Sequence, residues 1–150
     1  MTEFSRTYSL DDAERIGAAI GAALMAGDVV ALSGDLGAGK TTLARAMLKA
    51  RGLAGEAPSP TFAIVQPYAP PEVDLAIAHV DLYRIDDQDE LIELGLDDYL
   101  YDGALLIEWP ERLGSEGWPD MLLLTISGEG DARVLTASVP PAWGARWPLR

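Results

Sequence analysis

The sequence predicts an α/β fold, in which a central, mostly parallel sheet packs between helices and gains antiparallel strands late in the chain. Up to about residue 107, short apolar runs alternate with segments of helical period, a pattern that favours parallel strands with helical crossovers. Two later strand-like runs, 121–127 and 133–139, are joined by a short glycine-rich turn, which favours an antiparallel pair. The order of the strands stays open.

The first predicted helix begins at Ser9, because a serine followed by acidic residues is typical of a helix N-cap and its first turn. It is expected to run to about Met25 and to end at Gly27. Apolar residues at helical spacing predict its buried stripe, which consists of Ile16, Ala19, Ile20, Ala23 and Leu24.

The next run, Asp28–Ser33, is apolar throughout and predicts a strand covered on both faces. Residues 41–50 have helical period, with Leu43, Met47 and Leu48 facing inward. The remaining expectations are strands at 62–66, 75–81 and 104–107, helical turns at 89–94 and 97–101, and a loop at 67–71, which contains three prolines.

A length of 150 residues without repeats or a long linker predicts a single domain over residues 1–150. The tail 140–150 contains Trp143 and Trp147 among prolines, and two alternatives remain for it: it packs back on the sheet or stays loose.

Composition excludes several classes of site and location. The chain has no cysteine and one histidine, which excludes disulfides, cysteine-based zinc sites and histidine-rich metal sites. The first residues do not resemble a secretory signal, and no apolar run is long enough to cross a bilayer, so a cytoplasmic protein is expected.

The net charge of −13, from 24 acidic and 11 basic side chains, opposes binding to phosphate backbones. Direct binding of RNA or DNA is therefore not expected, and in a nucleic-acid pathway another protein would hold the nucleic acid. The stretch 86–102 carries eight carboxylates and no Lys or Arg, and is either a partner-facing surface or a solvated helical face.

Residues 34–41 match the pattern G-x-x-x-x-G-K-[ST] without deviation, directly after an apolar strand and at the start of a helix. Glycines allow such a loop to wrap around phosphates with its backbone N–H groups, while the helix N-terminus adds partial positive charge. Lys40 is then expected to reach the β- and γ-phosphates, and the Thr41 hydroxyl to take one position on Mg²⁺. The sequence thus predicts a nucleotide-binding site of the P-loop class.

Two carboxylates are candidates for completing this site, because each ends an apolar strand. Asp81 follows the run 76–80 and Glu108 follows the run 105–107. Such sites need a carboxylate near Mg²⁺ and a group that orients or deprotonates water. Glu108 is the preferred general base, although an ion pair with Arg112 would also explain it, and the roles of the two acids are interchangeable at this level.

Four segments together resemble the TsaE (YjeE) family, the bacterial ATPases of tRNA threonylcarbamoyladenosine biosynthesis. They are Gly34–Thr42, Ser59-Pro-Thr-Phe62, His79-Val-Asp-Leu-Tyr-Arg84 and Ile107-Glu-Trp-Pro-Glu-Arg112. Their order and spacing fit the family over about residues 5–139.

The resemblance implies a P-loop NTPase-like, three-layer α/β fold with ATP as the nucleotide. It further implies Mg²⁺ held by Thr41 and Glu108, with Asp81 required nearby. It also implies Thr61 as a sensor of the γ-phosphate and Trp109 as an aromatic beside the site, with Ser9 and Arg133 on the base and ribose side. The implied nucleotide contacts of the loop are Gly34, Gly37, Ala38, Gly39, Lys40, Thr41 and Thr42. The implied partners are TsaD and TsaB, with tRNA reached only through that complex.

Other classes of protein use the same loop. A small-molecule kinase usually covers the transferred phosphate with several arginines, whereas Arg84 and Arg112 are isolated here. A GTPase is disfavoured, because Asp81 does not begin a D-x-x-G pattern and no N-K-x-D segment exists. A nucleotide-gated binding module with little hydrolysis of its own remains open.

Overall fold

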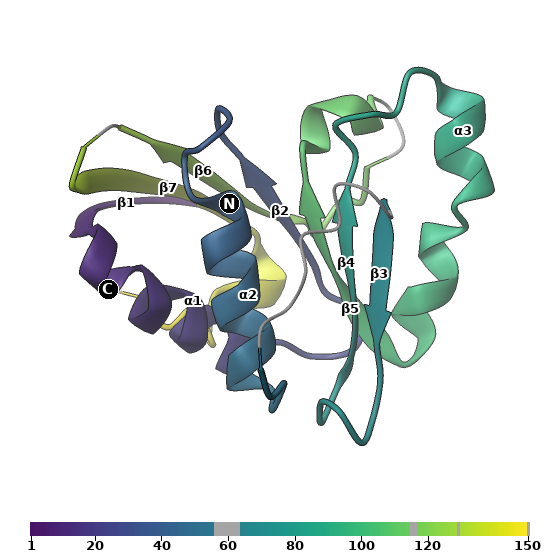
Figure 1. The fold of residues 1–150 in the computed structure, drawn as a ribbon, viewed down its shortest axis with the longest axis horizontal. Coiled ribbons are helices and arrows are strands. Elements are labelled where there is room, and N and C mark those ends of the chain that lie inside the picture. Colours follow the sequence, from purple (N-terminus) through teal and green to yellow (C-terminus); the bar gives the residue numbers. More distant parts are fainter. Residues whose placement is uncertain (56–63, 115–116, 129, 150) are drawn as a thin grey trace.

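The computed structural model describes residues 1–55, 64–114, 117–128 and 130–149, and its centre is a mixed sheet of seven strands (Figure 1). The strand order is β1-β7-β6-β2-β5-β4-β3. The bounds are β1 Thr2–Ser9, β2 Val29–Ser33, β3 Val65–Tyr68, β4 Ala76–Asp81, β5 Gly103–Glu108, β6 Leu122–Ser127 and β7 Ala132–Val139. The helices are α1 Ala13–Ala22, α2 Lys40–Ala50 and α3 Gln88–Glu93, with short 3₁₀ turns η1 Leu10–Asp12, η2 Leu96–Tyr101, η3 Pro110–Leu113 and η4 Pro141–Trp143.

The four central strands, β6-β2-β5-β4, are parallel, whereas β3, β7 and β1 are added antiparallel at the two sides. The predicted mostly parallel sheet with antiparallel additions is thus confirmed. Because carboxyl ends of parallel strands meet at one edge of a sheet, the segments that follow β2, β4 and β5 lie together. These segments carry the predicted loop and both candidate carboxylates.

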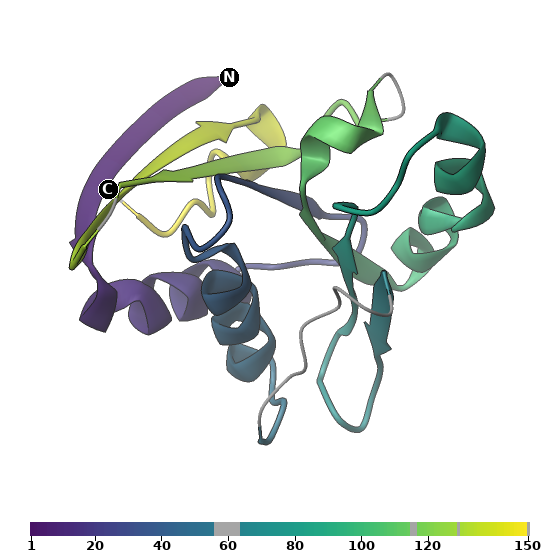
Figure 2. The same cartoon turned by 45° about the horizontal axis from the view of Figure 1, so that its top comes forward.

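Apolar side chains fill both faces of the sheet at β2, β4 and β5, which gives three layers there. Along β5, Ala104 and Leu106 belong to the core beneath α1 and α2, whereas Leu105 and Ile107 belong to the core beneath α3 and η2. In both orientations α2 and α3 lie on opposite sides of β3, β4 and β5 (Figure 2). A strand buried on both faces reads as a continuous apolar run, which explains the composition of β2 and β5.

Three local expectations were wrong. The first eight-residue strand, β1, was not predicted, because it is a largely exposed edge strand in which only Tyr8 is buried. The first helix is shorter than expected: α1 covers 13–22, after one 3₁₀ turn. The region expected to be a loop at 67–71 begins inside β3, where Pro67 pairs with Ala78. A proline is tolerated there because β3 is the outermost strand.

The tail packs against the sheet. Trp143 is fully buried, and it joins Trp147 and Leu149 in the core beneath α1. Arg146 lies 4.0 Å from the ring centroid of Trp143 and pairs with both oxygens of Asp28, at 2.6 and 2.7 Å. Of the two alternatives for residues 140–150, the packed one therefore holds for 140–149. No helix in the described part of the chain is long and apolar enough to cross a membrane.

Candidate functional site

The loop between β2 and α2 has a backbone that requires glycine at its turning points. Gly34 and Gly39 have φ angles of +152° and +111°, in a region that L side chains rarely adopt. A Cβ on Gly34 would also stand 2.6 Å from the carbonyl oxygen of Ile126 on β6. The loop is thus held tightly against the sheet at its first residue, and α2 starts directly at its end.

Lys40, the first residue of α2, points back over this loop. Its amine donates to the carbonyl oxygens of Gly34 and Asp35, the latter at 2.9 Å, and lies 4.3 Å from the ring centroid of Trp109. The side chain is buried, with 5% of its residue surface exposed. Burial lowers the pKa of Lys40, and the surrounding carboxylates, Glu108 first, oppose that shift. A cation held here favours an anionic ligand as its partner.

Thr41 and Glu108 are in direct contact. The Thr41 hydroxyl lies 2.9 and 3.0 Å from the two carboxylate oxygens of Glu108. The second of these oxygens also lies 2.7 Å from Nε2 of His79. Glu108 itself is 3% exposed. The last residue of β5 is therefore a buried carboxylate fixed between helix α2 and strand β4.

Asp81 stands beside Glu108 at the end of the neighbouring strand, since the two residues are register partners in the β4–β5 pair. It is buried, and its carboxylate accepts a hydrogen bond of 2.9 Å from the backbone N–H of Tyr83. Parallel pairing thus brings both candidate carboxylates to one edge of the sheet, although 27 residues separate them in the chain. They line one pocket of about 240 Å³ together with Lys40 and Thr41.

This donor set suits Mg²⁺. A hydroxyl and two buried carboxylates supply hard oxygen ligands, which Mg²⁺ prefers, and the pocket leaves room for phosphate oxygens and water. Among the described residues, no cluster of three or more His, Asp or Glu side chains forms a self-sufficient metal site. An ion at Thr41 and Glu108 would accordingly depend on ligands from a bound nucleotide.

A second hollow, about 460 Å³, lies on the other side of the loop, between residues 34–38 and the β6–β7 turn. Arg133 lines it and donates through Nε to the carbonyl oxygen of Ala38 at 3.1 Å. Ser9 is close to Arg133 through the β1–β7 pairing, but its hydroxyl contacts the Asp12 carboxylate at 3.3 Å and does not line this hollow. The structure thus brings Arg133, rather than Ser9, to the loop.

Trp109 follows Glu108 with a φ of +61°, an uncommon conformation for a bulky residue. Its ring packs on Tyr83 at a centroid distance of 5.0 Å, and Pro110 follows it at the start of η3. Strained backbone of this kind is frequent at functional sites. The indole thereby covers Lys40 and one side of the pocket.

The other residues predicted to contact the nucleotide lie in different places. Gly37, Gly39 and Thr42 line the 240 Å³ pocket, and Ala38 lines the hollow beside Arg133. Thr61, with the whole segment Ser59–Phe62, lies outside the described residues.

Sequence reasoning gave no site role to two groups that the structure places there. His79 contacts Glu108, and Glu111 accepts a hydrogen bond of 3.1 Å from Ser33, the residue before the loop. One signal was available for His79, because strand residues two apart share a face and His79 stands two before Asp81. For Glu111 no local signal existed, since its partner is 78 residues away.

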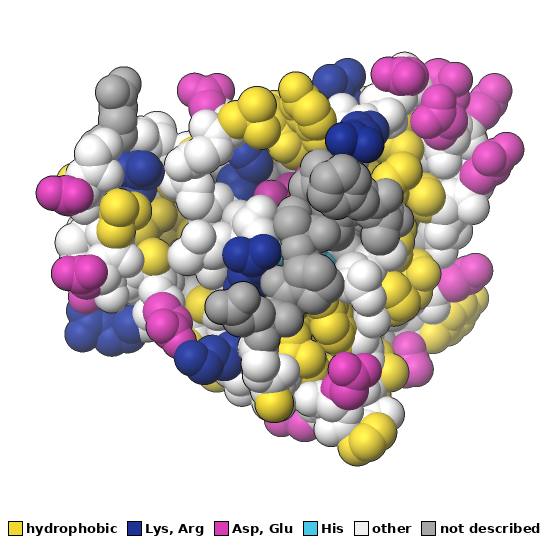
Figure 3. Space-filling model, viewed as in Figure 1, with side chains coloured by type: hydrophobic (Ala, Val, Ile, Leu, Met, Phe, Trp, Pro, Cys, Tyr) yellow, Lys and Arg dark blue, Asp and Glu magenta, His cyan; other side chains and the backbone are white. Residues whose placement is uncertain are grey.

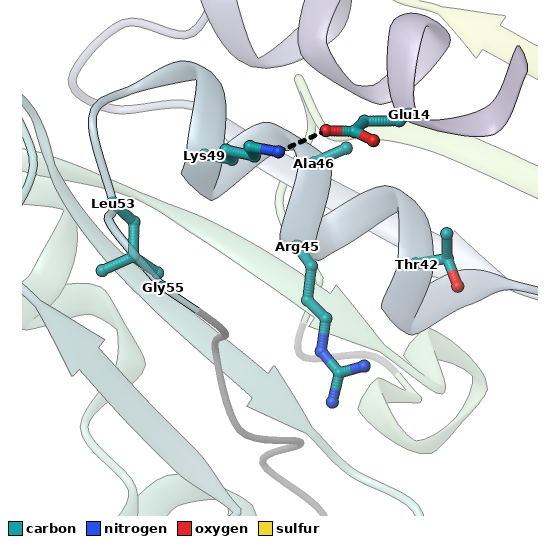
Figure 4. A pocket seen from close by; sticks show the side chains of 7 residues that line it. All are labelled: Glu14, Thr42, Arg45, Ala46, Lys49, Leu53 and Gly55. Atoms are coloured by element: carbon teal, nitrogen blue, oxygen red, sulfur yellow. Dashed lines mark hydrogen bonds and ion pairs between the residues drawn. The ribbon is translucent and has the colours of Figure 1, made fainter.

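Thr42 also borders a separate pocket of about 290 Å³ on the side of α2 (Figure 4). Its cations include Lys49, which pairs with Glu14 of α1 at 2.7 Å, and Arg45, which points away from that pair. These side chains are exposed, and no buried carboxylate is among the described residues that line this pocket. The pocket at Lys40 and Glu108 is therefore the candidate functional site.

Comparison with known proteins identifies the family of this chain. Residues 7–135 match the model of the family described as threonylcarbamoyl adenosine biosynthesis protein TsaE. A protein of Mycobacterium tuberculosis named tRNA threonylcarbamoyladenosine biosynthesis protein TsaE is 38% identical over 145 residues, covering 90% of this chain and 83% of the relative. The protein of that name from Bacillus subtilis is 35% identical over 127 residues, covering 84% and 78%.

Among solved structures, the crystal structure of Bacillus subtilis YdiB superimposes with a TM-score of 0.80 at 26% identity, covering 97% of this chain and 92% of the other. The family model matches most of the chain, and the relatives are more than one third identical to it. This chain therefore belongs to the TsaE family.

Proposed function

We propose that this protein binds and hydrolyses ATP with Mg²⁺, and that this activity supports formation of N6-threonylcarbamoyladenosine in tRNA. The observation that carries the proposal is the contact between the Thr41 hydroxyl of an intact phosphate-binding loop and the buried carboxylate of Glu108. A hydroxyl and a carboxylate so placed are the two protein ligands that Mg²⁺–nucleotide sites of this class require.

The proposed roles follow from the positions of the residues. Backbone N–H groups of 37–42, at the N-terminus of α2, bind the phosphates, and Lys40 swings from the loop carbonyls to the β- and γ-phosphates. When bound, Mg²⁺ neutralises charge that develops on the phosphates. Glu108 or its neighbour Asp81 accepts the proton of the attacking water, which becomes bonded to the γ-phosphorus as the bond to the ADP oxygen breaks.

The hollow beside Arg133 provides a place for the nucleoside. It adjoins the loop on the side away from Glu108, so a nucleotide whose γ-phosphate lies at Glu108 directs its base and ribose toward the β6–β7 turn. Trp109 then closes the phosphate side of the pocket through its contact with Lys40. Thr61 is proposed as a further group near the γ-phosphate.

The charge of the chain favours an indirect role toward tRNA. All eight carboxylates of 86–102 are exposed, and acidic side chains gather over the end of the molecule that carries α3 (Figure 3). This surface repels phosphate backbones. We therefore propose that the protein works in the cytoplasm on a complex of TsaB and TsaD, which holds the tRNA, and that its turnover is slow alone and stimulated by that complex.

A small-molecule kinase is the second candidate, and the described pocket does not favour it. No arginine is among the described residues that line the pocket at Lys40 and Glu108, whereas a kinase lid would bring several to the transferred phosphate. A kinase would also need a second substrate site next to the γ-phosphate, on the side that Trp109 covers.

The test compares Mg²⁺–ATP turnover of the wild-type and Glu108→Ala proteins, each alone and with a TsaB–TsaD complex. Glu93→Ala, which removes an exposed carboxylate on α3, is the matched control. We expect turnover that rises with the partners, is lost in Glu108→Ala and persists in Glu93→Ala. Equal turnover in all three proteins, unaffected by the partners, would contradict both the role of Glu108 and the proposed pathway.

A further inference from the structure

His79 is the one histidine of the chain and is completely buried, with 0% of its surface exposed. It lies on β4, two residues before Asp81, so both side chains emerge on the face that α2 covers. Its ring does not line the nucleotide pocket. It reaches that pocket only through Glu108, whose Oε2 is 2.7 Å from its Nε2.

The surroundings of the ring select one tautomer. Nδ1 is buried and has no hydrogen-bond partner among the described residues. A bare nitrogen at this position leaves an acceptor unsatisfied, whereas a protonated one would leave an N–H donor buried without an acceptor, which is rarer in proteins. With the proton on Nε2, the ring donates to a carboxylate oxygen, which is the stronger kind of hydrogen bond.

Glu108 depends on this donor for its orientation. Oε2 accepts from His79 at 2.7 Å, and the Thr41 hydroxyl, with a single proton, lies 2.9 and 3.0 Å from the two oxygens. That hydroxyl is also a proposed ligand of Mg²⁺. Once its oxygen turns to the ion, His79 becomes the contact that keeps the buried carboxylate of Glu108 aimed at the same point.

We propose that His79 is a positioning residue for Mg²⁺ binding: its Nε2–H fixes the carboxylate of Glu108 next to Thr41 without contacting the nucleotide. This inference rests on the proposed function, because it concerns the ion that ATP brings. Groups that orient metal ligands by a hydrogen bond typically contribute ten- to hundred-fold in metal affinity or activity, which sets the size of the effect.

Two substitutions separate the hydrogen bond from the volume of the ring. His79→Leu fills the buried site without a donor, whereas His79→Gln retains an N–H group at a similar reach. Ile77→Val, on the same face of β4 but in the apolar core, is a control for a small loss of packing. Thermal unfolding of each protein establishes that it is folded before binding is measured.

The first readout is calorimetric binding of ATP with Mg²⁺ and of ATP with a chelator. For His79→Leu we expect the Mg²⁺ concentration that gives half of the maximal gain in ATP affinity to rise about ten- to hundred-fold. The affinity for ATP measured in the presence of the chelator should stay at the wild-type value. His79→Gln recovers most of the loss, and Ile77→Val retains the wild-type dependence. A folded His79→Leu protein with wild-type Mg²⁺ dependence overturns the inference, as does an equal loss with and without Mg²⁺.

The second readout does not involve nucleotide. Since the sequence has a single histidine, ¹⁵N spectra of the untagged protein report its ring alone. The inference is supported if the wild-type ring carries its proton on Nε2 and that proton is no longer hydrogen-bonded in the Glu108→Ala protein. A wild-type ring with its proton on Nδ1 overturns the inference. Failure of the wild-type protein to bind Mg²⁺–ATP would instead refute the proposed function, whatever the ring spectrum shows.

Discussion

Helices α1 and α2 approach each other so closely that their contact depends on two glycines, Gly17 and Gly21, one turn apart in α1. A Cβ on Gly21 would lie 2.6 Å from Cα and 2.7 Å from the carbonyl oxygen of Met47 in α2. Both are backbone atoms, so no side chain can rotate away. Gly21→Ala must therefore push α2, which begins with Lys40 and Thr41, away from α1.

Two opposing terms set the magnitude for Gly21→Ala. Alanine in a helix interior is favoured over glycine by about 0.5–1 kcal/mol. Overpacking a close-packed contact typically costs about 1–3 kcal/mol. The second term is larger here because a whole helix has to shift, and we expect a net loss of about 1–2 kcal/mol in the free energy of unfolding.

Urea denaturation of the purified protein measures this loss in the free energy of unfolding. In thermal unfolding, each kcal/mol lost corresponds to a fall in Tm of about 2–4 °C for a chain of this size. Arg15→Ala, on the exposed side of the same helix, is the matched control and should change the free energy of unfolding by less than about 0.5 kcal/mol. If Gly21→Ala equalled or exceeded the wild-type stability, the close approach of α1 and α2 would be refuted.

Four further predictions concern other buried groups. Trp143→Ala should lower the free energy of unfolding by about 3–5 kcal/mol, since the ring is fully buried, and a denaturant-measured loss below about 1 kcal/mol would mean that the tail does not pack. Burial raises the pKa of the Tyr8 and Tyr68 hydroxyls above 10.0. The unfolded chain therefore releases these protons first, and the free energy of unfolding should fall as the pH rises through 10. Replacing both tyrosines by Phe should make this fall less steep in unfolding curves measured at alkaline pH. An unchanged slope would contradict the raised pKa values. Tyr68→Phe alone should be neutral or stabilising at pH 7, because the hydroxyl is buried without a partner in the described residues, and a clear loss in Tm would contradict this. Burial lowers the pKa of Lys40, so its charge disfavours the folded protein. Lys40→Met should thus raise the denaturation midpoint measured without nucleotide while abolishing ATP binding in calorimetry; a lower midpoint would show that the carbonyl contacts outweigh burial.

The parts of the site that local sequence could predict are those made by consecutive residues. The loop 34–41 carries its own turn glycines, lysine and hydroxyl, and a strand and a helix on either side specify its place in the fold. Asp81 and Glu108 could be found because each ends a mostly apolar run, and that pattern marks a strand end regardless of its neighbours.

Edge elements were predicted least well. β1 has a mostly polar, exposed sequence, and it becomes a strand through eight residues of pairing with β7 rather than through its own pattern. Pro67 suggested a loop, yet it is accommodated in β3 because that strand is the outermost one in the described part of the sheet. Whether a strand is central or at an edge is decided by the whole sheet, so neither case was visible locally.

By itself, the sequence determined the glycine-rich loop 34–41 between a strand and a helix, the buried central strands and the exclusion of cysteine-based or histidine-rich metal sites, because these depend on residue type and short-range spacing. Only the tertiary structure decided that β5 pairs with β2 and β4, that Glu108 meets Thr41 and His79, and that Trp143 closes the core. Each of those contacts joins residues far apart in the chain, and their partners are fixed by how the layers pack rather than by any local preference.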